Sequence, residues 1–254
     1  MPENWEAYLC QIEDKPASIV VNLGLREEAP IEGLEELVWI RVALLDARPD
    51  GLWSDEESET LGEIEDALIL AVEEAEGAII YAGRTTCDGS RDFFFYASDG
   101  MSAESRLSAA MVPFPSYEFE IGTKSEPEWT AYLEFLYPST RDFQLISNEQ
   151  LTRLLLSHGD DPTIVREVSH WAYFETPEDR AQFLAEVLSQ GFTAEDQNDE
   201  DETQIRPYKL TFAREDPVDL ATMNRVTLDL FDLAQTCNGE YDGWETTVEK
   251  PNVE

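Results

Sequence analysis

Hydrophobic and polar residues alternate in the first part of the chain as they do in β-strands. Trp5–Ile12 and Ser18–Leu23 show this pattern on either side of a turn at Asp14–Pro16, which predicts a hairpin. Leu37–Leu45 is an almost continuous apolar run, typical of a central strand with both faces covered. The chain therefore begins with a sheet.

A helical pattern follows the central strand. Ser54 precedes three acidic residues, which is typical of a helix N-cap, and apolar residues then recur at spacings of three and four at Leu61, Ile64, Leu68 and Val72. Further elements are predicted as the hairpin Ala78–Thr86 and Arg91–Ala97, the helix Ser102–Met111, the strand Ser116–Thr123 and the short helix Pro127–Leu136. The first half is thus expected to be an α+β sheet domain.

The second half predicts the order β-α-β-β-α-β after a boundary at Pro138–Thr140 and a helix at Asn148–Ser157, capped by Asn148 or Ser147. The predicted elements are Val165–Glu175, Pro177–Ser189, Phe192–Ala194, Ile205–Ala213, Pro217–Gln235 and Tyr241–Val248. Both helices carry apolar stripes suited to one face of a four-stranded sheet. We therefore expect an α+β protein of two domains, residues 1–140 and 141–254. The second is expected to be a ferredoxin-like sandwich, and the first an α+β sheet domain of similar style.

Charge narrows the range of partners. The chain of 254 residues has 17 Lys and Arg against 55 Asp and Glu, a net charge of −38, yet 42% of its residues are hydrophobic. A folded body with this charge repels phosphates, so nucleic acid and anionic membranes are not expected partners, whereas a basic protein is. The densest segment is Glu195–Glu202, with six carboxylates in eight residues, which we interpret as a solvated loop.

The sequence indicates neither an active site nor a bound cofactor. It contains no nucleotide loop, nucleophile elbow, His-Glu-x-x-His or Cys-x-x-Cys motif, and its two histidines are too few for a convincing zinc site. Three widely spaced cysteines favour a reducing cytoplasm over a disulfide framework, and neither a signal peptide nor a membrane span is predicted.

Two motifs have both a structural and a functional interpretation. His158–Pro162 contains the pair Asp160 and Asp161, which could serve as metal ligands or as an acid/base pair, but its position at a helix end favours a C-cap and turn. Tyr241–Trp244 reads as a strand with a bulge at Gly243, or as an interface if Trp244 is exposed. We interpret His170 as a half-buried, hydrogen-bonded sheet residue on the same face as Arg166.

Three stretches of the second half together resemble a bacterial family, the regulators of ribonuclease E activity B. They are His158–Pro162 with Arg166–Phe174, then Phe183 to Phe192, and finally Gly239–Glu245. The resemblance covers roughly residues 147–249, and it implies a ferredoxin-like fold and non-catalytic inhibition of an RNA-degrading endonuclease through that enzyme's basic scaffold region. The first half is similar to a domain family of unknown function, through Trp5 with Tyr8, Asp50–Leu52, Gly83–Thr86 and Trp129–Pro138.

The resulting hypothesis is a non-catalytic, acidic regulatory protein of the cytoplasm that binds an Arg-rich region of a ribonuclease E-like endonuclease and modulates RNA degradation. The residues expected to contact the partner are Glu195, Asp196, Asp199, Glu200, Asp201, Glu202, Tyr241, Asp242, Trp244, Asp160 and Asp161. Two alternatives stay open: a hydrolase that uses a carboxylate-bound divalent metal ion, and an acidic structural or salt-adapted protein without a basic partner.

Overall fold

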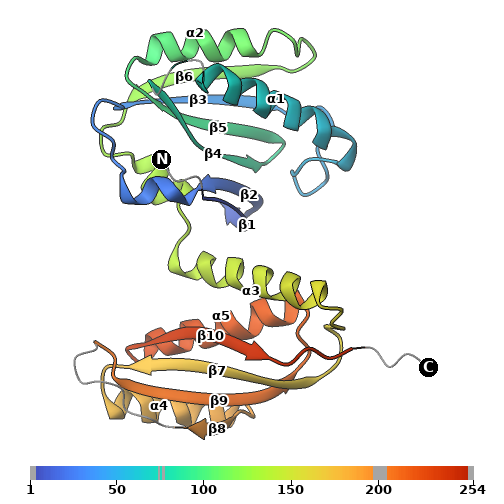
Figure 1. The fold of residues 1–254 in the computed structure, drawn as a ribbon, viewed down its shortest axis with the longest axis vertical. Coiled ribbons are helices and arrows are strands. Elements are labelled where there is room, and N and C mark those ends of the chain that lie inside the picture. The colour runs from blue at the N-terminus through green and yellow to red at the C-terminus, as the bar shows by residue number, and fades with distance from the viewer. Residues whose placement is uncertain (1–3, 74, 76–77, 197–204, 251–254) are drawn as a thin grey trace. The chain divides into compact units, whose positions relative to one another are not determined.

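The structure is a computed structural model that describes residues 4–73, 75, 78–196 and 205–250, and it divides into two compact units, Met1–Pro138 and Ser139–Glu254. Each unit contains one antiparallel sheet with helices packed on it (Figure 1). The predicted fold class, α+β in two domains, is confirmed.

The first unit is built on a six-stranded sheet with the order β1-β2-β4-β5-β3-β6. Every neighbouring pair in it is antiparallel. The strands are β1 (Trp5–Ile12), β2 (Lys15–Asn22), β3 (Glu36–Ala43), β4 (Ile79–Cys87), β5 (Ser90–Ala97) and β6 (Phe119–Ser125). As its apolar run predicts, β3 is interior, between β5 and β6.

Two helices cover one face of this sheet. They are α1 (Asp55–Glu73), whose first turn donates to the Ser54 hydroxyl as predicted, and α2 (Gly100–Ala110), capped by the side chain of Asp99. Their apolar residues join those of β3, β4 and β5 in one buried cluster. The predicted spacing of three and four on α1 therefore corresponds to its core-facing side, since Leu61, Ile64, Leu68 and Val72 are all buried.

The segment after β6 packs on the sheet through aromatic side chains. Trp129 is fully buried and stacks on Tyr96 with ring centroids 3.8 Å apart, and its indole nitrogen donates to the Leu34 carbonyl. The short helix η2 (Ala131–Leu136) follows, and the hydroxyl of its Tyr132 donates to the Asn22 carbonyl at 2.8 Å. The other short helix, η1 (Leu23–Glu27), connects β2 to the segment that leads into β3.

The second unit is built on a four-stranded sheet with the order β10-β7-β9-β8, again antiparallel throughout. Its elements are α3 (Thr140–Ser157), β7 (Arg166–Phe174), α4 (Pro177–Ser189), β8 (Thr193–Asp196), β9 (Tyr208–Asp216), α5 (Leu220–Thr236) and β10 (Gly239–Thr246). After α3 the order is β-α-β-β-α-β, as the sequence pattern predicts.

Several predicted boundaries in this unit are wrong. The strand predicted at Ile205–Ala213 is β9, three residues later at both ends, and the helix predicted at Pro217–Gln235 is α5, which begins three residues later. Helix α3 begins eight residues earlier than predicted, because Ser139 and Asp142 form a capping box, in which each side chain accepts from the other residue's backbone N–H. Glu195 and Asp196 belong to β8 instead of a loop, since Asp196 pairs with Thr211 of β9.

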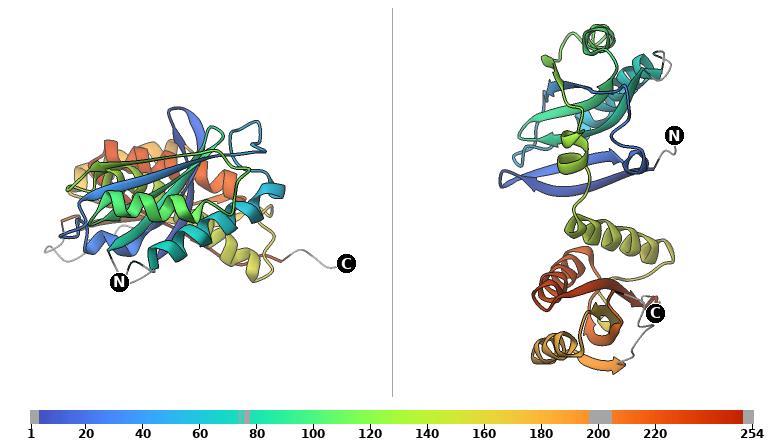
Figure 2. Two further views of the ribbon diagram at one scale, coloured as in Figure 1. Left: turned by 90° about the horizontal axis from the view of Figure 1, so that it is seen from above. Right: turned by 90° about the vertical axis from the view of Figure 1, so that its left-hand side faces the viewer.

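Helices α4 and α5 pack on the same face of the sheet, as the right panel of Figure 2 shows. Phe183 and Val187 of α4 and Leu230 and Ala234 of α5 share one buried cluster with Phe212 of β9. Helix α3 packs beside α5, through Leu155 against Met223 and Trp244. The opposite face of the sheet is therefore free of the helices α3, α4 and α5.

Candidate functional site

The face of the second sheet that the helices do not cover carries two large aromatic side chains. On β7 the residues Val168, His170, Ala172 and Phe174 are buried, so the residues between them point the other way. Those residues are Glu167, Ser169, Trp171 and Tyr173, of which Trp171 and Tyr173 are half-buried. We call this surface the open sheet face; it consists of these four residues with Lys209, Thr211 and Glu215 of β9 and Glu240 and Glu245 of β10.

Strand register places charged groups beside both rings. Tyr173 lies between Glu240 of β10 and Lys209 of β9, and the Lys209 ammonium is 5.8 Å from the centre of the Tyr173 ring. Trp171 lies between Gly243 and Thr211. Lys209 over the Tyr173 ring shows that this face can hold a cation against an aromatic side chain.

Several carboxylates share this face with the aromatic pair. Glu167 pairs with Glu215 across the sheet, and Glu245 lies opposite Ser169. Within the described part of the chain these three carboxylates are exposed and have no ion-pair partner, whereas Glu240 pairs with Arg206 at 3.0 Å. Like charges facing each other across strands repel, so the Glu167 and Glu215 pair favours a bound cation.

Sequence reasoning missed Trp171 and Tyr173 as surface residues. The signal was present, because the strand Val165–Glu175 alternates and its inward positions carry Val168, Ala172 and Phe174. Two aromatic residues at the outward positions of a strand with one covered face therefore predict an exposed aromatic surface.

Tyr241 and Trp244, predicted to contact a partner, are instead part of the core. Trp244 is 7% exposed and its indole nitrogen donates to the Asn148 side-chain oxygen at 2.8 Å. Tyr241 is 2% exposed, and its hydroxyl shares a hydrogen bond of 2.8 Å with Nδ1 of His170. The register shift between Tyr241 and Gly243 confirms the predicted bulge. The prediction that Trp244 and Tyr241 face a partner is wrong, because both rings pack under the helices.

Asn148 has a different role from the predicted helix cap. It lies within α3, 1% exposed, and its amide donates to the side-chain oxygens of Asn224 and Thr227 on α5 while it accepts from Trp244. These three hydrogen bonds give the buried amide a structural role. Asn148 therefore connects α3, α5 and β10.

The pair Asp160 and Asp161 is a turn, and Asp160 forms a buried ion pair. The Arg166 guanidinium donates to both carboxylate oxygens of Asp160, and the side chains of the two residues are 4% and 0% exposed. Asp160 also accepts from the backbone of Glu249 at 2.7 Å, which ties the segment after β10 to this turn. Asp160 is therefore not available to a partner.

Asp161 is half-buried and caps the turn. Its carboxylate accepts from the hydroxyl and the backbone N–H of Thr163, and these hydrogen bonds lower the pKa of Asp161. His158 ends α3, with Gly159 in the left-handed region after it, so this motif is the predicted C-cap and turn. Among the described residues no group of three or more His, Cys, Asp or Glu side chains is placed to hold a metal ion.

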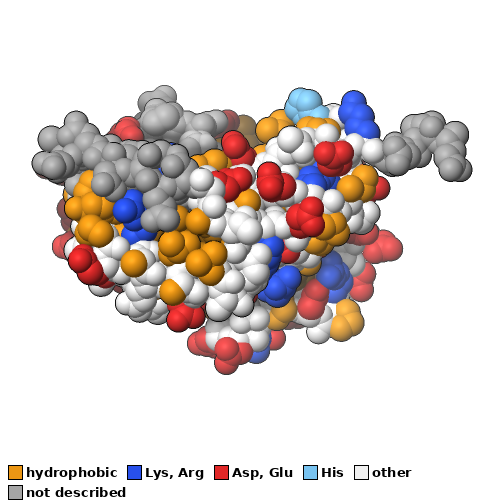
Figure 3. Space-filling model, turned by 90° about the horizontal axis from the view of Figure 1, so that it is seen from below, with side chains coloured by type: hydrophobic (Ala, Val, Ile, Leu, Met, Phe, Trp, Pro, Cys, Tyr) orange, Lys and Arg blue, Asp and Glu red, His pale blue; other side chains and the backbone are white. Residues whose placement is uncertain are grey.

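The other predicted residues divide into exposed ones and ones outside the described range. Asp242 is exposed at the bulge of β10, and Glu195 is exposed on β8, the edge strand. Asp199, Glu200, Asp201 and Glu202 lie outside the described residues, and of Asp196 only the backbone pairing is described. On the face drawn in Figure 3 acidic side chains are scattered among hydrophobic ones instead of forming a single patch.

His170 is more deeply buried than predicted and gives a testable pH dependence. It is 0% exposed, and burial, with a smaller effect of Arg214, lowers its pKa from 6.5 to about 3.

Because the unfolded chain binds a proton below pH 6.5 that the folded chain does not, stability falls as the pH falls. We expect a loss of about 2 kcal/mol between pH 7.5 and pH 5 from this group. This loss is measured by urea unfolding of wild type and His170→Phe at both pH values, with NMR signals of the β7 amides as the probe. Equal pH dependence in both proteins would contradict a lowered pKa of His170.

The fold and the site define a two-unit α+β protein whose second unit has a helix-free sheet face with two half-buried aromatic side chains and several carboxylates. Family models match both units. The chain belongs to the Family of unknown function (DUF695), whose model matches residues 3–137, and its residues 145–246 match the model of the family Regulator of ribonuclease activity B.

One curated relative and one solved structure complete the comparison. The protein named Regulator of ribonuclease activity B from Idiomarina loihiensis (strain ATCC BAA-735 / DSM 15497 / L2-TR) is 23% identical over 111 residues, which are 43% of this chain and 87% of that protein. The crystal structure of an unknown protein from Galdieria sulphuraria aligns with a TM-score of 0.24 at 11% identity and covers 84% of this chain and 99% of that one. None of the helices in the described residues is both long and apolar enough to cross a membrane.

Proposed function

We propose that this protein regulates a ribonuclease without catalysis of its own, by holding an Arg-rich segment of that enzyme on the open sheet face. The observation that carries the proposal is the pair Trp171 and Tyr173, set among carboxylates on a sheet face free of helices, within the unit that matches the regulator family. Guanidinium groups stack on aromatic rings and pair with carboxylates, so an Arg-rich segment satisfies both features of the surface.

The partner in this proposal is the basic scaffold region of a ribonuclease E-like endonuclease in the cytoplasm. A net charge of −38 gives long-range attraction to such a region, while the rings give short-range contact. Asp242 and Glu195 are exposed and keep their proposed role at the rim of the surface. Further acidic residues are proposed to extend the attraction: Asp196 at the end of β8, and Asp199, Glu200, Asp201 and Glu202, which follow it in the sequence.

The proposal predicts that Trp171→Ala weakens binding of a basic scaffold peptide by tenfold or more, mainly through faster dissociation, because a central aromatic contact at an interface is worth about 2 kcal/mol. Surface plasmon resonance with the full-length protein measures both rates. Phe119→Ala is the matched control, since Phe119 is a partly exposed aromatic residue of the first unit. Unchanged dissociation from a folded Trp171→Ala protein would reject the open sheet face as the binding surface.

Two further variants, each of which loses three negative charges, test the contribution of the carboxylates on the open sheet face. One neutralises Glu167, Glu215 and Glu245 on the open sheet face, and the other neutralises Glu178, Glu186 and Asp229, which are exposed on α4 and α5. We expect the first variant to slow association several-fold more than the second at low salt, and the difference to shrink as salt screens the charges. Equal slowing in both would indicate attraction by net charge alone.

A further inference from the structure

The first unit contains a pocket that the proposed function does not use. It has a volume of about 650 Å³ and lies between α1 and the strands β1, β2 and β4, at the side of the sheet where β1 forms the edge. A pocket of this volume is in the range of small-molecule sites. Its location in the unit of unknown function makes it independent of the open sheet face.

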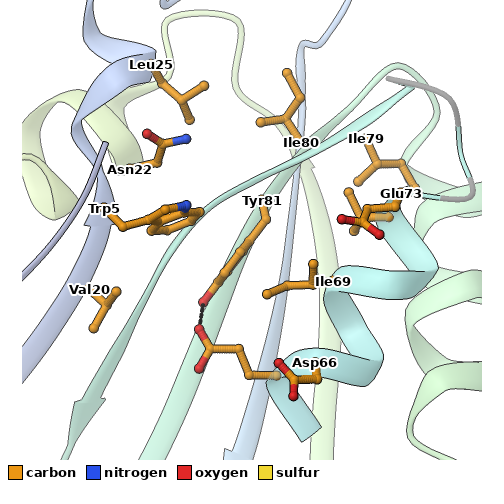
Figure 4. A pocket seen from close by; sticks show the side chains of 12 residues that line it. Trp5, Val20, Asn22, Leu25, Asp66, Ile69, Glu73, Ile79, Ile80 and Tyr81 are labelled. Atoms are coloured by element: carbon orange, nitrogen blue, oxygen red, sulfur yellow. Dashed lines mark hydrogen bonds between the residues drawn. The ribbon is translucent and has the colours of Figure 1, made fainter. Parts of the chain in front are cut away.

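Two aromatic rings form the centre of the pocket. Figure 4 shows Trp5 and Tyr81 side by side, and their ring centroids are 5.1 Å apart. Trp5 is 38% exposed, whereas Tyr81 is buried and its hydroxyl donates to Glu65 at 2.8 Å. Burial raises the pKa of Tyr81 well above its ordinary value, so the phenol stays neutral, and the hydrogen bond to Glu65 holds the ring in place. The pocket therefore offers a fixed ring beside a more accessible one.

Hydrocarbon side chains complete the walls. Val20 of β2, Ile69 and Val72 of α1 and Ile79 of β4 line the pocket with the two rings. Figure 4 shows the side chains of Ile69 and Ile79 on the opposite side of Tyr81 from Trp5. Such walls accommodate the apolar body of a ligand.

The charges at the pocket are negative and lie on one helix. Asp66 and Glu73 line the pocket seven residues apart, two helical turns, and both are exposed with no ion-pair partner among the described residues. Glu65 differs, because Arg84 neutralises it at 2.8 Å. The last turn of α1 contains no basic residue, so the partial negative charge of the helix C-terminus adds to that of Glu73.

We propose that this pocket binds a small organic cation, an alkyl ammonium or alkyl guanidinium compound, with its hydrocarbon part against the rings and its charged head at Asp66 and Glu73. Anions are excluded by the carboxylates and the helix end. Two helical turns separate the carboxylates by about 10 Å, so a head group between them gains attraction from both, while the hydrocarbon part gains from contact with the rings. A neutral ligand of the same shape gains only from the apolar walls.

The test compares butylguanidinium with its neutral isostere butylurea on the full-length protein. We expect butylguanidinium to shift the indole N–H resonance of Trp5, assigned by its loss in Trp5→Phe, in a saturable way, and butylurea to bind at least tenfold more weakly. Equal binding of both probes would overturn the proposal. Tighter binding of an arginine-containing peptide than of butylguanidinium would also overturn it, since the site would then serve a polypeptide.

Matched variants separate the pocket from the general attraction of a highly acidic protein. Asp66→Asn with Glu73→Gln removes two charges at the pocket, and Glu59→Gln with Glu63→Gln removes two exposed charges of the same helix outside it. We expect at least a tenfold loss of butylguanidinium affinity in the first protein and less than a twofold change in the second. Equal losses would show attraction by net charge only and would reject the site. Circular dichroism melting of all variants verifies that each is folded.

Discussion

Asp160→Asn is expected to destabilise the second unit by about 3–5 kcal/mol, because it removes one partner of a buried ion pair and leaves the other charge buried without compensation. Arg166 would retain only uncharged acceptors, the new amide oxygen and the carbonyls of Asp161, Ile164 and Thr247. The backbone N–H of Glu249 would also lose its charged acceptor. Hydrogen exchange under native conditions measures the change at β7 separately from the first unit, which matters because a protein of two units need not unfold in one step.

The neighbouring carboxylate supplies the control. Asp161→Asn makes the same chemical change one residue away, but the Asp161 side chain is half-buried and bonds only to Thr163 within the described residues, so the effect on protection at β7 should be small. A double change to apolar residues, Asp160→Leu with Arg166→Met, should recover most of the loss, since the lone buried charge is then gone. Equal effects of Asp160→Asn and Asp161→Asn would contradict a structural role for the ion pair.

Segments with strong local signals were predicted closely. Helix α4 begins and ends where predicted, because Pro177 fits the first turn, Thr176 caps it, and Gly191 supplies the left-handed conformation after its end. Strand β7 was predicted to within one residue at each end from its alternation. In these segments local preference and tertiary packing agree.

Helix α3 was predicted too short because two local signals competed. Ser147 and Asn148 are good cap residues, but Ser139 with Asp142 forms the cap that the structure uses. Asn148 is tolerated within the helix because its amide gains partners from α5 and β10. Those partners are 76 or more residues away in the sequence, so local reasoning did not reveal them.

The predicted exposure of Tyr241 and Trp244 was wrong for a geometric reason. Tyr241 and Trp244 are three residues apart, which in a regular strand places them on opposite faces of the sheet. The bulge between Tyr241 and Gly243 adds one residue, so that Tyr241 lies opposite Ala172 and Trp244 opposite His170, both on the covered face. The bulge predicted at Gly243 is confirmed, and it turns both side chains toward the covered face. Trp171, with no such irregularity on its own strand, was the better candidate.

Trp244→Ala is expected to cost about 3–5 kcal/mol of stability in the second unit, in contrast to Trp171→Ala on the other face of the sheet. Removal of the indole leaves a cavity between α3, α5 and β10, lined by Leu155, Val168 and Met223. It also leaves the side-chain oxygen of Asn148 without its indole donor, a further penalty for a buried polar group. Trp244→Phe separates these two contributions, because the phenyl ring fills part of the volume but donates no hydrogen bond.

We therefore expect Trp244→Ala and Trp171→Ala to have opposite effects on amide protection and on peptide binding. Trp244→Ala should reduce amide protection in β7 and α5 strongly, while at temperatures where it is still folded its affinity for a basic scaffold peptide should change little. Trp171→Ala should leave protection nearly unchanged and accelerate dissociation of the peptide, because a half-buried side chain on an uncovered sheet face contributes more to a contact than to the core. A folded Trp244→Ala protein that loses the peptide as readily as Trp171→Ala would show that binding depends on the covered face or its helices, and would move the proposed surface away from Trp171 and Tyr173.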